Sequence, residues 1–408
     1  MRKIILSALL LAALAVLPFT GPSLPPRPAP AFVPTADERE KLALYRQPEQ
    51  WFIEHLAGPR EVIDGQTLDP KFQYMMEQLR PHRWLINHGI PLIFSTPAGR
   101  RWLRGGADRE WQLYTRVTAP MRSVEDRVIP GRDGGIAVRI YHPETATAGP
   151  LPILVYHHGG GWIFASVAAM DRVVRLIANE ARAIVVSVDY RLAPEHPYPA
   201  ASDDGEDAFL WARAHAAALG GSADLVAVGG DSAGGHVAIN ITQRQLAAGK
   251  PLPRALLLYY PGTGMPSADR SYRLFGRGYG LDAAFIEFIL PLVFPGMRES
   301  DARDDFMDPL RARSLAGFPP TIIATAGFDI LRDSGRAFAR RLDHEGVPVA
   351  YFNYASLTHS FLQFSGVIDD ADQAASGTAR LFGHVARDPA RLAQRPLPMA
   401  PEALAQAR

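Results

Sequence analysis

The sequence of 408 residues contains no cysteine. This absence excludes disulfide bonds, thiolate zinc sites, iron–sulfur clusters, a cysteine nucleophile and a lipid-modified N-terminal cysteine. Lysine is scarce too, because the basic residues are nearly all arginine and the lysines are Lys3, Lys41, Lys71 and Lys250. We attribute this bias to genome composition and not to function. Any catalytic nucleophile must therefore be Ser, Thr, Lys or a carboxylate.

The sequence also lacks an excess of charge of either sign. It has 43 Lys plus Arg against 42 Asp plus Glu, a net charge of +1. Nucleic-acid binding requires several basic side chains to neutralise phosphates, so we exclude nucleic acid as a partner. With 47% hydrophobic and 21% charged residues, the chain is long enough to bury a substantial core, as one large domain or two modest ones.

A short apolar run occupies residues 4–16, directly after Arg2 and Lys3. A positive start, 7–15 apolar residues and a small-residue site such as residues 29–31 are typical of a secretory signal peptide. The run is shorter than the about 20 residues that span a membrane. We therefore expect residues 1–31 to direct export to the periplasm or the medium. The alternative is an uncleaved N-terminal anchor, which would be the sole membrane contact.

Two regions of different character follow this segment. Residues 32–122 carry aromatic and apolar side chains among charges and are cut by Gly and Pro into short helices, so we predict a helical N-terminal extension. Over residues 123–385, strand-like runs alternate with helical ones. Apolar strands separated by helices are typical of an α/β fold with a mostly parallel sheet covered on both faces. Ligands of such folds bind beyond the carboxyl ends of the strands.

The predicted elements of this second region can be placed one by one. Strands are predicted at 136–141, 153–157, 183–189, 225–229, 255–260, 321–326 and 347–354. Helices are predicted at 168–182, 203–219, 233–248 and 334–346, the second with Asp203 and Asp204 at its positive dipole end. An excursion at 262–296, with a helical run near 281–293, is either a second lid element or a surface loop. Residues 386–408 lack periodicity, so we expect a flexible tail.

A glycine-flanked serine follows the strand predicted at 225–229. The sequence GDSAGG at residues 230–235 contains G-x-S-x-G between a strand and a helix, the context that this motif requires. The glycines allow a sharp turn, and the helix N-terminus favours developing negative charge. The pentapeptide alone could be an ordinary Gly-rich turn. In this context it predicts Ser232 as a nucleophile.

A serine hydroxyl needs an imidazole to take its proton and a carboxylate to orient that imidazole. In hydrolases built on an α/β sheet, the chain order is Ser, then Asp or Glu, then His. Asp329 follows the strand predicted at 321–326, and His359 follows the strand predicted at 347–354. We assign these two residues as acid and base. The less well placed competitors are Asp308, Asp333, which is expected at a helix start, His236, His344 and His384.

Three consecutive glycines follow the strand predicted at 153–157, in HHGGGW at residues 157–162. An HGGG-type element supplies backbone N–H groups to an oxyanion, together with the residue after the nucleophile. We assign Gly160, Gly161 and Ala233 as these donors. A flexible turn and a phosphate-binding loop are competing interpretations. However, the sequence contains no P-loop motif, and the spacing of these glycines matches the G-x-G-x-x-G motif of dinucleotide-binding folds poorly. Adjacent histidines on a strand point to opposite faces, so we expect no metal and no cofactor.

Together these motifs resemble the hormone-sensitive lipase family of α/β-hydrolase esterases. DYRLAPEHPYPAA at residues 189–201 is similar to the segment that follows the family's oxyanion loop. FPPTIIATAGFDILRDSG at residues 318–335 resembles the segment with the triad acid, and HSF at 359–361 stands where the family usually has His-Gly-Phe. The resemblance covers roughly residues 128–364. It implies an α/β-hydrolase fold with a helical cap, formed by residues 32–122 and by the excursion at 262–296.

These observations predict a carboxylic ester hydrolase that forms an acyl-enzyme on a small-molecule ester. We expect short to medium acyl chains, because a capped pocket limits the size of its ligand. One alternative is a non-catalytic protein that binds a small ligand on the same fold, and the presence of all three triad candidates disfavours it. Another is an amidase or deacylase of a specific metabolite, which only substrate profiling can separate. Whether the chain forms a homodimer stays open.

Overall fold

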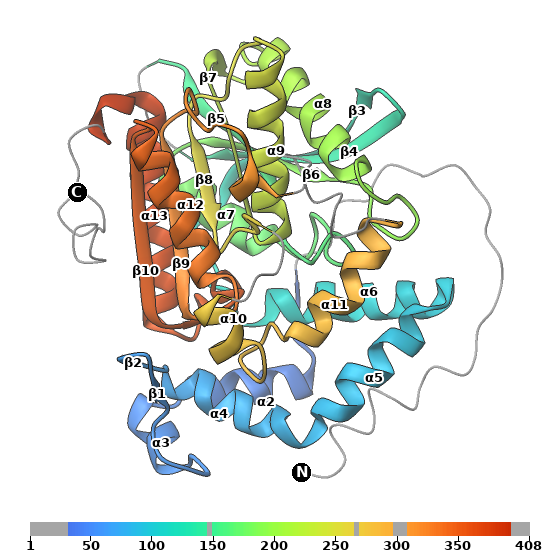
Figure 1. The fold of residues 1–408 in the computed structure, drawn as a ribbon, viewed down its shortest axis with the longest axis vertical. Helices are drawn as coiled ribbons and strands as arrows, with labels where there is room; N and C mark the ends of the chain where they lie inside the picture. Colours follow the sequence, from blue (N-terminus) through green and yellow to red (C-terminus); the bar gives the residue numbers. More distant parts are fainter. Residues whose placement is uncertain (1–31, 145–148, 265–268, 297–307, 393–408) are drawn as a thin grey trace.

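The computed structural model describes residues 32–144, 149–264, 269–296 and 308–392. An eight-stranded sheet crosses the molecule in the order β10-β9-β8-β7-β5-β6-β4-β3 (Figure 1). The expected signal peptide or anchor at residues 1–31 lies outside the described residues. The sheet strands are β3 (Met121–Gly131), β4 (Gly134–Pro143), β5 (Leu151–His157), β6 (Ile184–Asp189), β7 (Gly221–Asp231), β8 (Leu256–Tyr259), β9 (Thr321–Phe328) and β10 (Val349–Thr358).

The sheet is mostly parallel, as predicted. All neighbouring pairs from β10 to β6 are parallel, whereas β3 pairs antiparallel with β4 and β4 pairs antiparallel with β6. Parallel strands are buried on both faces and read as continuous apolar runs, and for this reason the sequence located them within a few residues. The α/β-hydrolase fold class is therefore confirmed.

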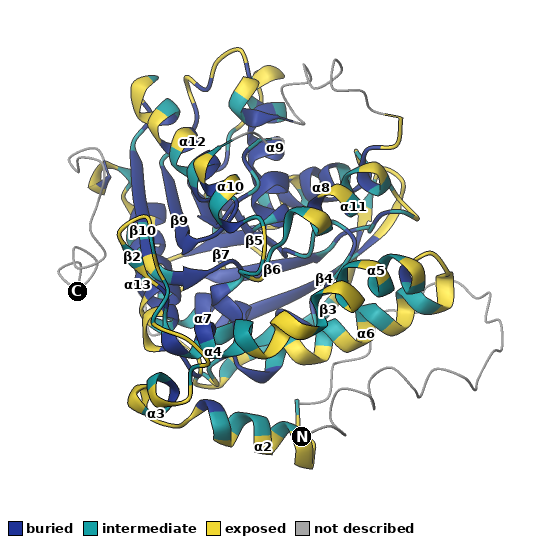
Figure 2. Cartoon of the chain, turned by 60° about the horizontal axis from the view of Figure 1, so that its bottom comes forward, coloured by how far each residue is buried: buried dark blue, intermediate teal, exposed yellow. Residues whose placement is uncertain are grey.

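Helices cover both faces of the sheet, so β5 is buried on both sides (Figure 2). Ile153 and Val155 pack with one hydrophobic cluster, whereas Leu154 and Tyr156 pack with the other. Successive side chains of a strand alternate between the faces, which explains this division. The first cluster includes residues of α8 (Ala200–Ala214), α9 (Ala233–Ala247) and α12 (Arg332–His344), and the second includes residues of α7 (Asp171–Ala181) and α13 (Asp369–Arg387).

The N-terminal extension is helical, as the sequence predicts, and a small hairpin interrupts it. Its helices lie together at the lower side of the molecule, and the helices of the 262–296 excursion lie next to them (Figure 1). The extension comprises α2 (Ala36–Tyr45), α3 (Glu49–Glu54), β1 (Val62–Ile63), β2 (Gln66–Thr67), α4 (Pro70–Leu79), the 3-10 helix η1 (Arg80–His82), α5 (Arg83–Phe94) and α6 (Pro97–Leu113). The excursion contains α10 (Arg270–Phe275) and α11 (Ala283–Val293).

Two predicted segments have wrong boundaries. The helix predicted at 203–219 is α8, which begins at Ala200, after Pro199, and ends at Ala214. Asp203 lies in its first turn, as predicted, whereas Asp204 is buried and accepts hydrogen bonds from Arg191. The tail predicted from residue 386 is ordered as far as residue 392, because α13 continues and a buried Leu392 packs in the core after the 3-10 helix η5 (Pro389–Arg391). Residues 393–408 lie outside the described residues.

The sequence analysis predicted neither the helix α13 nor the strand β3. α13 buries its face largely with alanine, and β3 is an edge strand with many polar residues, so neither shows a strong apolar pattern. The described part of the chain contains no helix with the length and apolar character needed to cross a membrane.

Candidate active site

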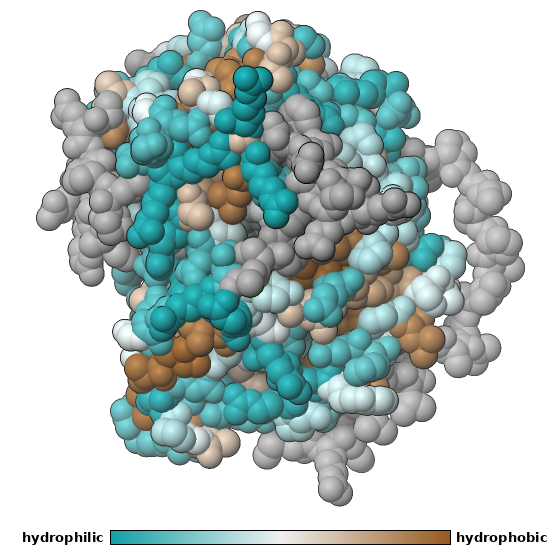
Figure 3. All heavy atoms as spheres, in the orientation of Figure 1, coloured by the Kyte–Doolittle hydropathy of each residue, from teal (hydrophilic) through white to brown (hydrophobic). Residues whose placement is uncertain are grey.

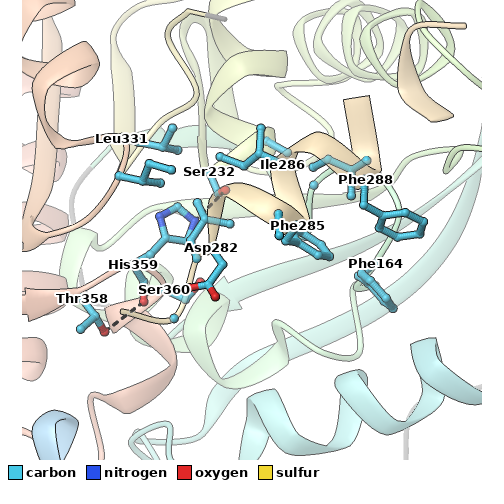
Figure 4. A pocket seen from close by; sticks show the side chains of 18 of the residues that line it. Phe164, Ser232, Asp282, Phe285, Ile286, Phe288, Leu331, Thr358, His359 and Ser360 are labelled. Atoms are coloured by element: carbon cyan, nitrogen blue, oxygen red, sulfur yellow. Dashed lines mark hydrogen bonds between the residues drawn. The ribbon is translucent and has the colours of Figure 1, made fainter. Parts of the chain in front are cut away.

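The structure brings Ser232, His359 and Asp329 together just beyond the carboxyl ends of β7, β10 and β9. The Nε2 atom of His359 lies 2.9 Å from Ser232 Oγ, and its Nδ1 atom lies 2.8 Å from Asp329 Oδ2. Ser232 and His359 face each other in the pocket (Figure 4). An imidazole between a hydroxyl and a carboxylate can receive the hydroxyl proton and is held in one tautomer by the carboxylate.

Ser232 occupies a strained turn between β7 and α9. Its φ of 53° lies in the left-handed region, which few residues other than glycine adopt. A Cβ atom at Gly230 or Gly234 would clash with the carbonyl oxygen of His157. Both glycines are therefore required for the turn to approach the end of β5. This close approach places Ser232 beside the glycine-rich loop.

Asp329 and His359 extend from the ends of β9 and β10, as the sequence predicts. Asp329 is 1% exposed, and its Oδ1 atom accepts a hydrogen bond of 2.9 Å from the backbone N–H of Leu331. The competing Asp333 lies in the first turn of α12 and accepts from Ser271 N–H. His236 lines the same pocket, but its ring packs edge-on against Trp162 with centroids 5.3 Å apart. These contacts give Asp333 and His236 structural roles.

The three glycines at residues 159–161 form a loop beside Ser232. Gly160 and Gly161 have φ values of 110° and 61°, and both line the pocket with Ala233. Ile163 and Phe164 donate backbone hydrogen bonds to the carbonyl of Gly160, which closes the loop into a tight turn. Within the described ranges, the N–H groups of Gly160, Gly161 and Ala233 donate no hydrogen bond. They can bind an anionic oxygen formed near Ser232.

Asp231 is a site residue to which the sequence analysis assigned no role. It is 1% exposed, and its Oδ1 atom accepts from Tyr156 OH at 2.8 Å and from Gly159 N–H at 2.9 Å. Burial raises the pKa of this carboxyl to about 6. Asp231 therefore connects the serine turn to the glycine loop. Its place beside Ser232 in the motif was the available signal.

His157 and His158, considered above for metal binding, are buried in the core. Burial lowers the pKa of each imidazole to about 4, so both are neutral near pH 7. His157 Nδ1 is hydrogen-bonded to Gly229 O at 3.1 Å, and the His158 ring stacks on Tyr190 with centroids 4.2 Å apart. Across the described ranges, no group of three or more His, Cys, Asp or Glu residues could hold a metal ion.

A largely apolar cavity of about 510 Å³ opens over Ser232. One wall contains Phe164 and side chains of α11, among them Phe285, Ile286 and Phe288 (Figure 4). Other lining residues come from segments far apart in the chain, namely Phe72, Met75, Met76, Leu79, Trp111 and Phe364. A charged pair also lies on the lining, because Arg83 of α5 contacts Asp282, just before α11, at 2.8 Å.

A serine, a histidine and an aspartate at the carboxyl ends of a mostly parallel sheet, next to a glycine-rich loop, define the class of α/β hydrolases. The comparison with known families agrees, because residues 154–363 match the family model described as alpha/beta hydrolase fold. The chain belongs to this family, and within it to the hormone-sensitive lipase group of esterases.

Individual relatives bear ester-hydrolase names. The carboxylic ester hydrolase LipN of Mycobacterium tuberculosis is 38% identical over 315 residues, which cover 75% of this chain and 80% of the relative. The carboxylesterase NlhH of the same organism is 40% identical over 264 residues, 62% of this chain and 80% of the relative. Among solved structures, an ester hydrolase from the metagenome of Lake Arreo has a TM-score of 0.71 and 33% identity, and covers 78% of this chain and 98% of its own.

Proposed function

We propose that this protein is a carboxylic ester hydrolase with Ser232, His359 and Asp329 as its catalytic triad. The observation that carries the proposal is the continuous set of contacts from Ser232 Oγ through the His359 ring to Asp329, at 2.9 and 2.8 Å. The apolar cavity above Ser232 and the ester-hydrolase names of the relatives support it.

The chemistry follows from the positions of these groups. Ser232 Oγ attacks the ester carbonyl carbon while His359 Nε2 takes the hydroxyl proton, and Asp329 holds the resulting imidazolium. The N–H groups of Gly160, Gly161 and Ala233 stabilise the negative oxygen of the tetrahedral intermediate. Collapse of this intermediate releases the alcohol, which receives the proton from His359. Water then repeats the sequence on the acyl-enzyme, releasing the acid and restoring Ser232.

The size and the largely apolar lining of the cavity support small, uncharged substrates. Its volume of about 510 Å³ lies within the range of drug-sized ligand sites, about 300–1,000 Å³. Walls from α4, α5 and α11 enclose it, which favours esters with short to medium acyl chains. We also propose that the N-terminal helices and the 262–296 excursion act as a cap over the site, and that residues 1–31 direct export.

The direct test is hydrolysis of a series of p-nitrophenyl esters, from acetate to palmitate, by the purified protein. We expect the highest kcat/KM between butyrate and octanoate. Ser232→Ala should fold normally and lose at least about 10³-fold in kcat. Ser187→Ala, which removes a buried hydroxyl in β6 outside the pocket, is the matched control and should keep wild-type turnover.

Three outcomes would contradict the proposal. Wild-type turnover by Ser232→Ala would exclude that residue as the nucleophile. No hydrolysis of any ester by a well-folded protein would favour a ligand-binding protein on the same fold. Faster cleavage of the matched anilides than of the esters would favour an amidase or deacylase.

A further inference from the structure

The helix α5 is apolar on two faces, only one of which is covered. Its inner face lines the cavity with Ile86, Ile90 and Pro91, at the spacing of successive helical turns. Its outer face presents Trp84 and Leu92, which are 71% and 74% exposed, together with Leu85. A helix on the surface of a globular protein is normally polar on its outer face. The outer face of α5 is therefore unusual.

The exposed apolar side chains are concentrated in this region. Of the ten large hydrophobic residues that are exposed in the described chain, five lie between residues 79 and 102, namely Leu79, Trp84, Leu85, Leu92 and Trp102. Exposed hydrophobic residues that are scattered singly need no explanation, whereas a cluster marks an interaction surface. In the space-filling view, hydrophobic residues show on the face where α5 and α11 lie (Figure 3). We call Trp84, Leu85 and Leu92 the α5 surface.

Positive charge accompanies the α5 surface. Residues 80–107 contain five arginines and neither Asp nor Glu, although the whole chain has a net charge of only +1. Four of these arginines pair with three acids from other segments, and Arg101 is exposed without an ion pair among the described residues. The pairs are Arg80–Glu61, Arg83–Asp282, Arg100–Glu195 and Arg104–Glu195. The arginines of this segment therefore outnumber their acidic partners by two.

We propose that the α5 surface docks on an anionic lipid membrane. Tryptophan is enriched at membrane–water interfaces, and helices that lie in the interface combine exposed Trp and Leu with Arg or Lys beside them. Negative lipid headgroups attract the basic residues. A second copy of the chain fits less well, because a symmetric dimer contact would place the same basic patches against each other.

The docked position also has a consequence for substrate supply. The inner face of α5 lines the cavity over Ser232, so an ester that leaves the lipid has only the thickness of one helix, about 10 Å, between the membrane and the site. We infer that the enzyme takes apolar esters from the lipid phase, and this inference rests on the proposed hydrolase function. Docking itself does not depend on that function.

The absence of cysteine from the chain makes the docking test clean. A full-length Leu92→Cys variant carries one thiol, which can be labelled with an environment-sensitive nitrobenzoxadiazole dye. Vesicles of phosphatidylglycerol and phosphatidylcholine should shift its emission to the blue and raise its intensity at least about twofold, as expected for a group entering an apolar interface. The same dye at Val117→Cys, an equally exposed position between α6 and β3, should not respond.

Two results would overturn the docking proposal. One is an unchanged spectrum at Leu92→Cys in the presence of vesicles. The other is the same blue shift on raising the protein concentration without vesicles, which would assign the surface to a second copy of the chain. Because all variants retain residues 1–31, binding through that segment alone would give no change at Leu92→Cys and would count against the proposal.

A kinetic experiment tests the supply of substrate. The double variant Trp84→Ser, Leu92→Ser should hydrolyse a dissolved short ester within about twofold of the wild-type rate, but a vesicle-embedded ester at least about tenfold more slowly. Val117→Ser, Val128→Ser, an exposed pair elsewhere, should match the wild type on both. Equal rates for the double variant and the wild type on the vesicle ester would overturn the proposal. Absence of hydrolysis of the dissolved ester by the wild type would instead refute the hydrolase function.

Discussion

Ser360 stands next to His359, the proposed catalytic base, where the family usually has glycine. Its φ of 63° and ψ of 27° place it in the left-handed region. Glycine adopts this backbone conformation most easily, and Ser360 adopts it here despite its side chain. The departure from the family's pattern does not displace His359, which keeps its contacts with Ser232 and Asp329.

Ser360→Gly should therefore stabilise the protein. A left-handed L-residue costs about 1–2 kcal/mol, part of which is offset by the greater freedom of glycine in the unfolded chain. We expect the free energy of unfolding to rise by about 0.5–1 kcal/mol in urea titrations, with ester turnover within about twofold of wild type. Ser360→Ala keeps the backbone cost and should show no gain. A loss of stability in Ser360→Gly would show that the serine side chain makes a compensating contact.

The buried carboxyl of Asp231 predicts how the free energy of unfolding depends on pH. Burial raises the pKa of its carboxyl from 3.8 to about 6 in the folded state. Between these values the folded protein keeps a proton that the unfolded chain has released, so the free energy of unfolding decreases as the pH rises through this window. Asp231→Asn retains a side-chain oxygen that accepts from Tyr156 and Gly159 but cannot ionise. Its stability relative to wild type should rise by about 2–3 kcal/mol from about pH 4 to about pH 7.

Urea unfolding of both proteins at the two pH values measures this difference. The exposed Asp224→Asn serves as the control and should show the same offset from wild type at both. An equally constant offset for Asp231→Asn would mean that the carboxyl of Asp231 titrates alike in the folded and unfolded states.

At the level of elements, Arg104 joins the N-terminal helices to the active site. From α6 its guanidinium donates to the carbonyls of Ile163 and Ala193 at 2.8 and 2.9 Å and to Glu195 at 2.8 Å. Burial raises the pKa of Glu195, but the hydrogen bonds from Arg104 and Arg100 outweigh it and lower the pKa to about 2. One side chain thus attaches α6 to the loop that follows Gly160 and Gly161.

Replacement of Arg104 should loosen this attachment. Arg104→Met leaves the carbonyls of Ile163 and Ala193 without this donor and leaves Arg100 as the remaining partner of Glu195. We expect a loss of about 2 kcal/mol in the free energy of unfolding. Arg104→Lys keeps the charge but not the planar set of donors, so it should recover only part of this loss. The neighbouring Arg101→Met should change stability by less than about 0.5 kcal/mol. Equal stabilities for Arg104→Met and Arg101→Met would contradict this role.

The elements also show what could be predicted from the sequence. Strands such as β5 and β9 have continuous apolar runs because both of their faces are buried, and the reactive residues follow directly from their ends. The extension could be predicted only as helical. Its packing depends on contacts between distant segments, such as Phe72 of α4 against Phe364 with ring centroids 4.9 Å apart, which no local pattern records.

At the level of the whole molecule, the cavity is lined by segments that lie up to hundreds of residues apart in the sequence. Phe72 and Phe288 line it from α4 and α11, and Ser232 lies at the end of a central strand. The motifs in the sequence predict the reactive groups, whereas the cavity walls carry no motif. The acyl-chain preference therefore depends on packing that only the structure shows.

Phe288→Ala should extend the range of accepted esters. Removal of a large ring from the cavity wall leaves space for a longer apolar group, so kcat/KM for the decanoate ester relative to the butyrate should rise several-fold. Phe294→Ala removes a ring from the same hydrophobic cluster but not from the cavity lining, and should cost stability without changing this ratio. An unchanged ratio in Phe288→Ala would show that the ester's longer group lies elsewhere.

We propose that Ser232 is an activated nucleophile, and labelling with a fluorophosphonate probe is the direct test. An activated serine oxygen displaces fluoride and forms a stable phosphonate ester, whose position is mapped by mass spectrometry of peptides. We expect one adduct, on Ser232, and none in Ser232→Ala. Absence of an adduct in well-folded wild-type protein, or an equal adduct in Ser232→Ala, would contradict it.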